Sequence, residues 1–164
     1  MRELIRTLTE TYGPSGVEDK IRAAIRAEVE PLADEIRVDP LGSLVVRKAG
    51  EEGGKRIVLA AHMDEIGVMV TYVNEHGFAR FTRIGGVRAL NCVGGRVAFA
   101  DGTVGVIYIE TKGRDAVKAP KFEQLYLDVG AMSRDDCPVR VGDAAMFVRP
   151  FAVQGTRLIA KAMD

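Results

Sequence analysis

The chain has 164 residues, of which 47% are hydrophobic and 28% are charged, a length that suits one ordinary domain or a small domain with an insertion. Twenty-three basic residues balance twenty-three acidic ones, so no net charge favours nucleic acid or an anionic membrane surface as a partner. The longest apolar runs, such as residues 57–61, are too short to span a bilayer, and we expect a cytoplasmic protein with no membrane segment.

Two amphipathic helices are predicted at the start of the chain. Apolar residues at helical spacing predict a helix over residues 2–12, which Gly13-Pro14 ends. Ser15 and Glu18 then match the capping box S-x-x-E. We therefore expect a second helix to begin at this box and to end at Pro31.

After these helices the apolar period changes to two, which is typical of strands. Residues 36–38 and 44–46 flank the turn residues 40–42 and predict a β-hairpin. Residues 56–61 are apolar on both faces, as is typical of a central strand covered by helices. Two helices beside such a sheet predict an α/β layer.

From residue 66 onward, short strands follow one another with only turns between them. We expect strands at 66–73, 78–84, 95–100, 104–110, 124–129 and 144–149. Residues 74–77 and Asp101-Gly102 fit hairpin turns, and at most a short helix is expected near residues 133–136. Six short strands in succession predict a small closed or nearly closed barrel.

The last segment, residues 156–164, is another apolar strand that runs into a carboxylate and stops. We expect it to belong to a fold that is cut off at this point. Cys92 and Cys137 lie far apart in the sequence with no second cysteine near either, so we expect two reduced, partly buried thiols and neither a disulfide nor a cysteine-rich metal site.

The polar residues at the end of the predicted central strand are the main candidates for chemistry. In "AAHMDEIG" (60–67), residues two apart share a face, so His62 and Asp64 point together while Glu65 points away. This pattern fits a metal-bound imidazole oriented by a carboxylate, but it also fits an ordinary polar strand end. Asp64 and Glu65 make a poor glycosidase pair, because such carboxyls face each other across the substrate.

Other candidate residues have simpler interpretations. His76 lies in a predicted hairpin turn, where an exposed polar side chain is expected. Ser15 and Ser133 are better explained as helix caps than as nucleophiles. A basic loop is expected to be solvated, since acidic residues lie among its cations; the cations are Lys112, Arg114, Lys118 and Lys121.

Seven stretches, taken in order, carry a resemblance to a known family. They are "YGPSGVEDKIR" (12–22), "VDPLGSL" (38–44), "AAHMDEIGVMV" (60–70), "GFARFTRIGG" (77–86), "LYLDVGAMSRDD" (125–136), "VGD" (141–143) and "AKAMD" (160–164). In this order they resemble metallopeptidase family M42, the tetrahedral or glutamyl-type aminopeptidases, some of which are labelled endoglucanases. Two features depart from the sequence that is usual in the family. Ser43 stands where asparagine is common, and the loop "GGVRALNCVGG" differs from the usual family sequence.

The resemblance implies an α/β fold built from two parts. Residues 1–66 would form the first part of an α/β/α catalytic layer, and residues 67–155 an inserted, barrel-like dimerisation domain that makes homo-oligomers. Residues 156–164 would return to the catalytic layer and end at a metal-bridging aspartate. The activity would be removal of amino-terminal residues from peptides, by water activated between two divalent ions, zinc or cobalt.

The resemblance also implies site residues. His62 would bind one metal, Asp64 would orient His62, and Asp164 would bridge the two ions. The family's general base and remaining ligands have no match here, so we expect weak or partial metal binding and no activity from this chain alone. We also expect exposed apolar surface where the remaining sheet would pack. The alternative is a non-catalytic self-association module or pseudoenzyme fragment, and a glycoside hydrolase is less well supported.

Overall fold

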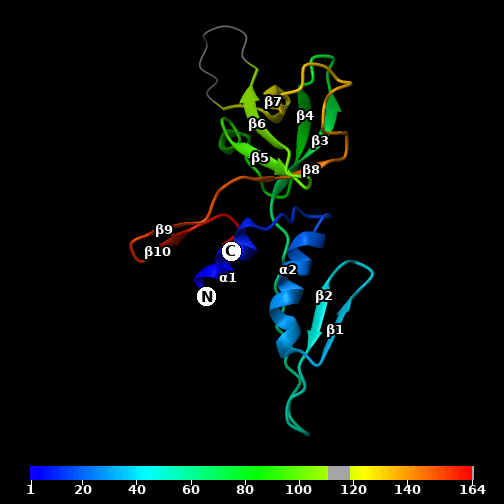
Figure 1. Cartoon of the computed structure of the whole chain (residues 1–164), viewed down its shortest axis with the longest axis vertical. Coiled ribbons are helices and arrows are strands. Elements are labelled where there is room, and N and C mark those ends of the chain that lie inside the picture. Colours follow the sequence, from blue (N-terminus) through cyan, green and yellow to red (C-terminus); the bar gives the residue numbers. More distant parts are fainter. Residues whose placement is uncertain (111–118, 164) are drawn as a thin grey trace. The chain divides into compact units, whose positions relative to one another are not determined.

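The computed structural model describes residues 1–110 and 119–163, and the chain divides into two compact units (Figure 1). The first unit contains residues 1–13, 17–64 and the described chain from Phe151 onward, and the second contains Pro14–Gly16 and Glu65–Pro150. The edges of the units therefore fall before the predicted domain boundaries at 66/67 and 155/156. The mixed helix and strand content with an inserted barrel confirms the predicted fold class.

The first unit contains both predicted helices. Helix α1 spans Arg2–Glu10 and α2 spans Asp19–Val29, followed by the short 3-10 helix η1 at Glu30–Leu32. None of these helices, nor any other in the described part of the chain, is long and apolar enough to cross a bilayer. Within the unit, the Phe151 backbone N–H donates to Glu10 Oε1 at 2.8 Å, which fixes the returning chain beside α1.

The predicted start of the second helix is wrong. Helix α2 begins at Asp19 with Glu18 as its N-cap, and the Glu18 side chain makes no capping hydrogen bond. Gly16 adopts a positive φ of 92° between Ser15 and the helix, so the chain turns before the helix starts and Ser15 lies outside its first turn. The Ser15 backbone N–H donates to the Glu65 carbonyl at 3.2 Å, within the second unit.

The predicted hairpin is confirmed. Strands β1 (Glu35–Val38) and β2 (Leu44–Arg47) pair antiparallel, with Val38 opposite Leu44. The Asp39 carboxylate accepts the backbone N–H groups of Leu41 and Ser43 at 2.9 and 2.8 Å, which closes the turn. These hydrogen bonds hold the pKa of Asp39 below its usual value.

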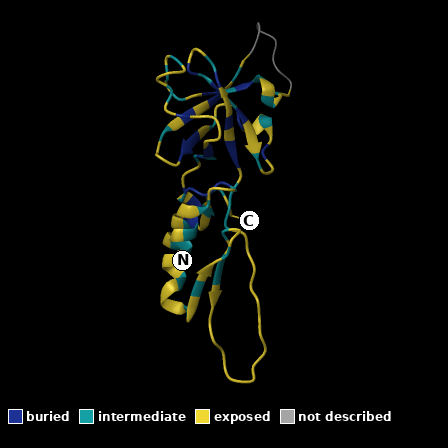
Figure 2. Cartoon of the chain, turned by 90° about the vertical axis from the view of Figure 1, so that its right-hand side faces the viewer, coloured by how far each residue is buried: buried dark blue, intermediate teal, exposed yellow. Residues whose placement is uncertain are grey.

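The predicted central strand is absent. Residues 56–61 form no strand and are exposed throughout, as Figure 2 shows for the whole segment after β2. A strand needs a neighbour for its backbone N–H and C=O groups, and β1 and β2 pair only with each other among the described residues. The Leu59 side chain is consequently 94% exposed. The apolar composition of this segment predicts that it can be buried. Burial also needs a neighbouring strand, and the described residues provide none.

The end of the chain forms a second small hairpin rather than one long strand. Strand β9 (Ala152–Gln154) pairs antiparallel with β10 (Arg157–Ile159). The predicted strand over residues 156–164 is therefore limited to its first part within the described chain. Gly155, with a positive φ of 61°, lies in the connecting turn.

The second unit is a closed six-stranded barrel, as predicted. Its strands are β3 (Gly67–Val73), β4 (Ala79–Ile84), β5 (Arg96–Phe99), β6 (Val104–Ile109), β7 (Leu125–Asp128) and β8 (Ala144–Phe147). Their order around the barrel is β3-β4-β7-β6-β5-β8, and every neighbouring pair is antiparallel. Closure removes the exposed strand edges that an open sheet would have.

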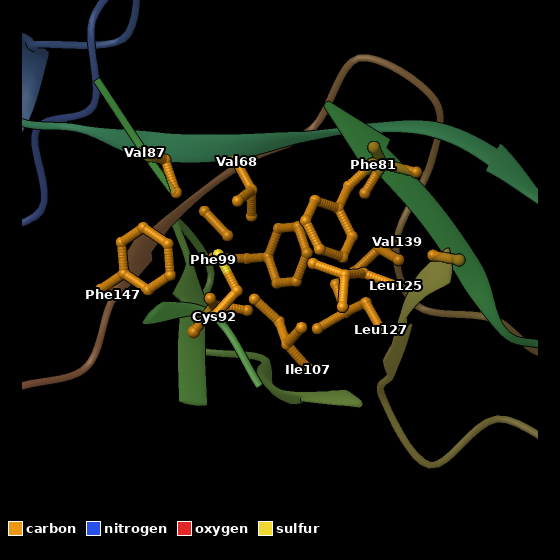
Figure 3. Close-up of a cluster of buried hydrophobic side chains, with 14 of the residues drawn as sticks. Val68, Phe81, Val87, Cys92, Phe99, Ile107, Leu125, Leu127, Val139 and Phe147 are labelled. Atoms are coloured by element: carbon orange, nitrogen blue, oxygen red, sulfur yellow. The ribbon is translucent and has the colours of Figure 1, made fainter. Parts of the chain in front are cut away.

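The barrel interior is filled by apolar side chains. They alternate with more exposed residues along β6 and β7, whereas β5 is buried at three consecutive residues. Figure 3 labels Val68, Phe81, Val87, Cys92, Phe99, Ile107, Leu125, Leu127, Val139 and Phe147 in this cluster. Two glycines allow the close packing: a Cβ on Gly67 would lie 2.6 Å from the Ala145 carbonyl oxygen, and one on Gly105 would lie 2.7 Å from Leu127. The barrel thus has a complete core of its own.

A turn, and not the short helix that we allowed for, follows β7 at residues 133–136. The Asp136 carboxylate accepts hydrogen bonds from the backbone N–H groups of Met132 and Ser133 and from the Ser133 hydroxyl. These bonds hold the pKa of the Asp136 carboxyl below its usual value. Ser133 therefore stabilises a turn, not a helix start.

Candidate functional site

The motif "HMDE" lies where the exposed segment of the first unit ends. His62 is exposed, while Met63 and Asp64 are partly buried. Asp64 is the last residue of this segment in the first unit, and Glu65 is the first residue of the barrel unit after it. The candidate site is thus formed by irregular backbone and not by the strand end that the sequence predicts.

The structure brings the side chains of His62 and Asp64 together. His62 Nδ1 lies 3.1 Å from Asp64 Oδ1 and also 3.1 Å from the Asp64 backbone carbonyl oxygen. The two side chains are 63% and 35% exposed, respectively. The contact is therefore a local hydrogen bond at a surface that a small solute can reach.

This contact has a chemical consequence for the imidazole. A neutral ring that donates its Nδ1–H to Asp64 presents its lone pair at Nε2, on the opposite side of the ring. Metal-binding histidines commonly have this arrangement, with one nitrogen oriented by a carboxylate or carbonyl and the other available as a ligand. The pair can therefore supply one oriented imidazole ligand.

Glu65 has a structural contact of its own. Its backbone carbonyl accepts the Ser15 N–H, and Pro14 and Glu65 form an isolated parallel β-bridge within the barrel unit. Asp64 in turn contacts His62. The Glu65 backbone is thus held within the barrel unit, whereas the Asp64 carboxyl lies beside the His62 ring.

The described residues do not form a complete metal site. Within residues 1–110 and 119–163, no group of three or more His, Cys, Asp or Glu side chains is placed to hold a metal ion. Asp164, the predicted bridging ligand, lies outside the described residues. The donor types present, one imidazole and an orienting carboxylate, fit a zinc or cobalt site, but two residues are fewer than such a site needs.

The remaining sequence candidates are placed at the surface or in the core. His76 is 71% exposed in the turn between β3 and β4, with Nε2 3.5 Å from Glu75. Of the basic loop, Lys112, Arg114 and Lys118 lie outside the described residues, and Lys121 is the N-cap of the short 3-10 helix η3 (Phe122–Gln124). His76 and Lys121 are thus exposed residues of the barrel unit.

The two cysteines are not bonded to each other. Cys92 lies fully buried in the barrel core and Cys137 is partly buried. Burial raises the pKa of the Cys92 thiol, although the Arg149 cation partly opposes this effect. A buried thiol of raised pKa is a poor nucleophile, so Cys92 serves packing.

Comparison with protein families gives one match that covers most of the chain. The family model described as "M42 glutamyl aminopeptidase" matches residues 42–164. This range contains the His62–Asp64 pair, the whole strand set of the barrel and the end of the chain.

Two relatives illustrate the similarity in sequence. A protein of Acetivibrio thermocellus, provisionally named an aminopeptidase, is 46% identical over 166 aligned residues, which cover 100% of this chain and 49% of the relative. The lysyl aminopeptidase of Pyrococcus furiosus is 30% identical over 95% of this chain and 47% of its own. The chain therefore spans about half the length of the curated relatives it matches.

Solved structures agree with the sequence comparison. A TET aminopeptidase from a marine-sediment Thaumarchaeota archaeon superposes with a TM-score of 0.84 at 33% identity, over 93% of this chain and 45% of that one. A Thermotoga maritima protein described as an endoglucanase superposes with a TM-score of 0.87 at 32% identity, over 98% and 49% of the two chains. The predicted resemblance is confirmed by both kinds of comparison.

Proposed function

Since the chain belongs to the M42 glutamyl aminopeptidase family, we propose that it is part of a cytoplasmic aminopeptidase that removes amino-terminal residues from peptides. The observation that carries this proposal is the 3.1 Å contact between His62 Nδ1 and Asp64 Oδ1, inside the segment that matches the family. It gives the imidazole the orientation that a metal ligand needs.

The complete enzyme would use two divalent ions, zinc or cobalt, which when bound polarise the scissile carbonyl and lower the pKa of a bound water. In this chain His62 would hold one ion through Nε2, and Asp64 would fix the ring orientation and tautomer. Asp164 would bridge the two ions. No residue in the chain is assigned as general base, so we expect weak metal binding and negligible hydrolysis from these residues alone.

The second part of the proposal is self-association through residues 67–155. The barrel has its own closed core, so it can present a surface without help from the first unit. One similar structure is titled a Pyrococcus horikoshii peptidase that assembles into a tetrahedron or an octahedral shell, which supports an oligomeric role here. The same observation favours the alternative, a non-catalytic self-association module, if metal binding fails.

The isolated chain offers the first test. With zinc or cobalt added, hydrolysis of aminoacyl p-nitroanilides should not exceed the rate of the metal alone, because the ligand set is incomplete. Robust turnover that His62→Ala abolishes would contradict the claim that the chain is inactive by itself.

A chimera tests the enzymatic role directly. The chain covers 47% of the Pyrococcus furiosus lysyl aminopeptidase, so it can replace the matched portion of that enzyme. We expect metal-dependent hydrolysis of lysyl p-nitroanilide, with a loss of roughly 100-fold or more for His62→Ala and about 10- to 100-fold for Asp64→Ala. His76→Ala, an exposed turn histidine, is the matched control and should leave the rate unchanged. Equal losses for the two histidine variants would count against the assigned site.

A further inference from the structure

The His62 ring has a second acceptor besides the Asp64 carboxylate. The Asp64 backbone carbonyl oxygen lies 3.1 Å from His62 Nδ1. A carbonyl oxygen can only accept, so this contact is a hydrogen bond only when Nδ1 carries the ring proton. Residues 60–64 form neither helix nor strand, so a regular backbone ladder does not fix this carbonyl. Whatever orients it therefore favours the tautomer that presents a lone pair at Nε2.

The Asp64 carbonyl belongs to a peptide group whose far end is held. A peptide group is planar and rigid, so the carbonyl oxygen turns only if the whole plane turns at the next Cα. That next residue is Glu65, which forms an isolated parallel β-bridge with Pro14. The Glu65 carbonyl also accepts the Ser15 backbone N–H at 3.2 Å. Because these contacts restrict the backbone of Glu65, they restrict the plane that carries the Asp64 carbonyl.

Pro14 gives this bridge a firm base within the barrel unit. Its ring fixes its own φ, and its side chain is less than 2% exposed. A Cβ built on Gly67 would lie 3.2 Å from the Pro14 Cβ and 2.6 Å from the Ala145 carbonyl oxygen. The bare backbone of Gly67 thus lets Pro14 pack directly on the start of β3, in the same compact unit. A side chain packed on the wall of a closed barrel has little freedom to move.

Glycines confine the bridge to a very short stretch of chain. On one side, Gly16 has a positive φ of 92°, which turns the chain away after Ser15. On the other side, a Cβ on Gly13 would lie 2.4 Å from Cγ2 of Ile21, so the residue before Pro14 has no room for a side chain. The bridge therefore does not extend into a strand, and its partner is the residue that follows Asp64.

We propose that the Pro14–Glu65 bridge, which we define by Pro14, Ser15 and Glu65, is a positioning element for the metal ligand His62. It fixes the peptide group between Asp64 and Glu65, which keeps the Asp64 carbonyl against His62 Nδ1 and the ligand lone pair at Nε2. The inference rests on the metal role proposed above for His62, but the effect on the ring tautomer does not require a metal. Pro14 and Ser15 act through the Glu65 backbone.

A purely structural role for the bridge makes a different prediction. Pro14 packs on Gly67, so its removal would then weaken the barrel and leave the His62 ring unchanged. A positioning role requires a change at the ring in a chain that is still folded. The tautomer of His62 separates the two roles, because stability alone does not determine which ring nitrogen carries the proton.

The test is NMR of the metal-free 164-residue chain, at a pH where both of its histidines are neutral. The chemical shifts of the ring nitrogens report which nitrogen carries the proton. His62 should be mainly the Nδ1–H tautomer in the original chain. Ser15→Pro removes the N–H that donates to Glu65, and Pro14→Gly removes the packed ring and frees φ. Each should shift His62 toward the Nε2–H tautomer, while the His76 ring in the same spectra stays unchanged.

Zinc titration of the same samples gives a second readout. Ser15→Pro and Pro14→Gly should each weaken zinc binding at His62 about 3- to 10-fold, less than removal of the Asp64 carboxylate, because they loosen an acceptor without deleting it. The conservative variant Ser15→Ala keeps the backbone N–H and should restore both readouts to near the original values. The matched control is Pro138→Gly, at an exposed position of the barrel unit. It frees the unfolded chain in the same way and should change neither readout.

The outcomes distinguish the bridge from the metal site. If Pro14→Gly and Ser15→Pro lower the urea midpoint but leave the His62 tautomer unchanged, the positioning role is overturned. Equal effects of Ser15→Ala and Ser15→Pro also overturn it, because the hydroxyl and not the backbone N–H would be responsible. An original chain in which His62 is mainly the Nε2–H tautomer overturns it as well. If zinc leaves His62 unchanged in the original chain, the proposed metal function fails, and the metal-free tautomer still decides the role of the bridge.

Discussion

At the scale of single residues, the contact between His62 and Asp64 forms as predicted, but on irregular backbone and not on a strand. The close approach of His62 and Asp64 was predicted from the spacing of two in an extended strand, and the pair does meet at 3.1 Å although no strand forms there. A short polar contact between near neighbours needs only local backbone freedom. By contrast, the helix start predicted at Ser15 was wrong, because a capping pattern does not say where the turn before a helix lies.

Asp136 gives a residue-scale prediction with a defined pH dependence. Its carboxylate accepts three hydrogen bonds in the turn after β7, and these lower its pKa in the folded chain. A carboxyl with a depressed folded pKa stabilises the fold above its unfolded pKa of about 3.9, and this contribution is lost as pH falls through the folded value. Asp136→Asn should therefore lower the urea midpoint at pH 7, and the difference from the original chain should shrink below pH 4.

The exposed neighbour Asp135 provides the control for this measurement. Asp135→Asn should leave the urea midpoint close to that of the original chain at both pH values. If Asp136→Asn and Asp135→Asn behaved alike at pH 7, the turn contacts of Asp136 would not be stabilising the fold.

At the scale of elements, the strands of the barrel were predictable because each is a short apolar segment bounded by turn residues. The hairpin β1–β2 and the six barrel strands form close to the predicted ranges. The outcome for residues 56–61 was not predictable in this way. Their apolar side chains indicate that the segment can be buried, but they do not indicate whether a partner strand is present. The structure leaves it without strand pairing and exposed.

The exposed segment leads to a prediction about aggregation. Ile57, Val58 and Leu59 form a continuous exposed apolar run, which favours non-specific association. Leu59→Lys should reduce aggregation, measured as light scattering while the protein solution is concentrated. It should change the free energy of unfolding by no more than about 0.5 kcal/mol, because the side chain is on the surface.

Leu41 supplies a matched comparison, since its side chain is 93% exposed but stands alone in the β1–β2 turn. Leu41→Lys should reduce scattering much less than Leu59→Lys does. A similar reduction by both variants would show that total apolar exposure, and not the run at 57–59, causes the association.

At the scale of the whole molecule, the division into two units explains which functions can be tested separately. The barrel unit has a closed sheet and a core, whereas the first unit holds two helices, two small hairpins and the His62–Asp64 pair. The succession of short strands from residue 66 onward was enough to predict the barrel. The assembly of a metal centre was not predictable from these residues, because its ligands must converge from separate segments and only two residues are assigned here.

The most direct test of the central claim, that His62 is a metal ligand oriented by Asp64, uses the fact that the chain has only two histidines. Zinc is titrated into isotopically labelled chain while the ring signals of His62 and His76 are followed by NMR. We predict saturable shifts at His62 at sub-millimolar zinc, weakened about 10-fold or more by Asp64→Ala, with no comparable shift at His76. Unmoved His62 signals, or equal shifts at both rings, would contradict the account.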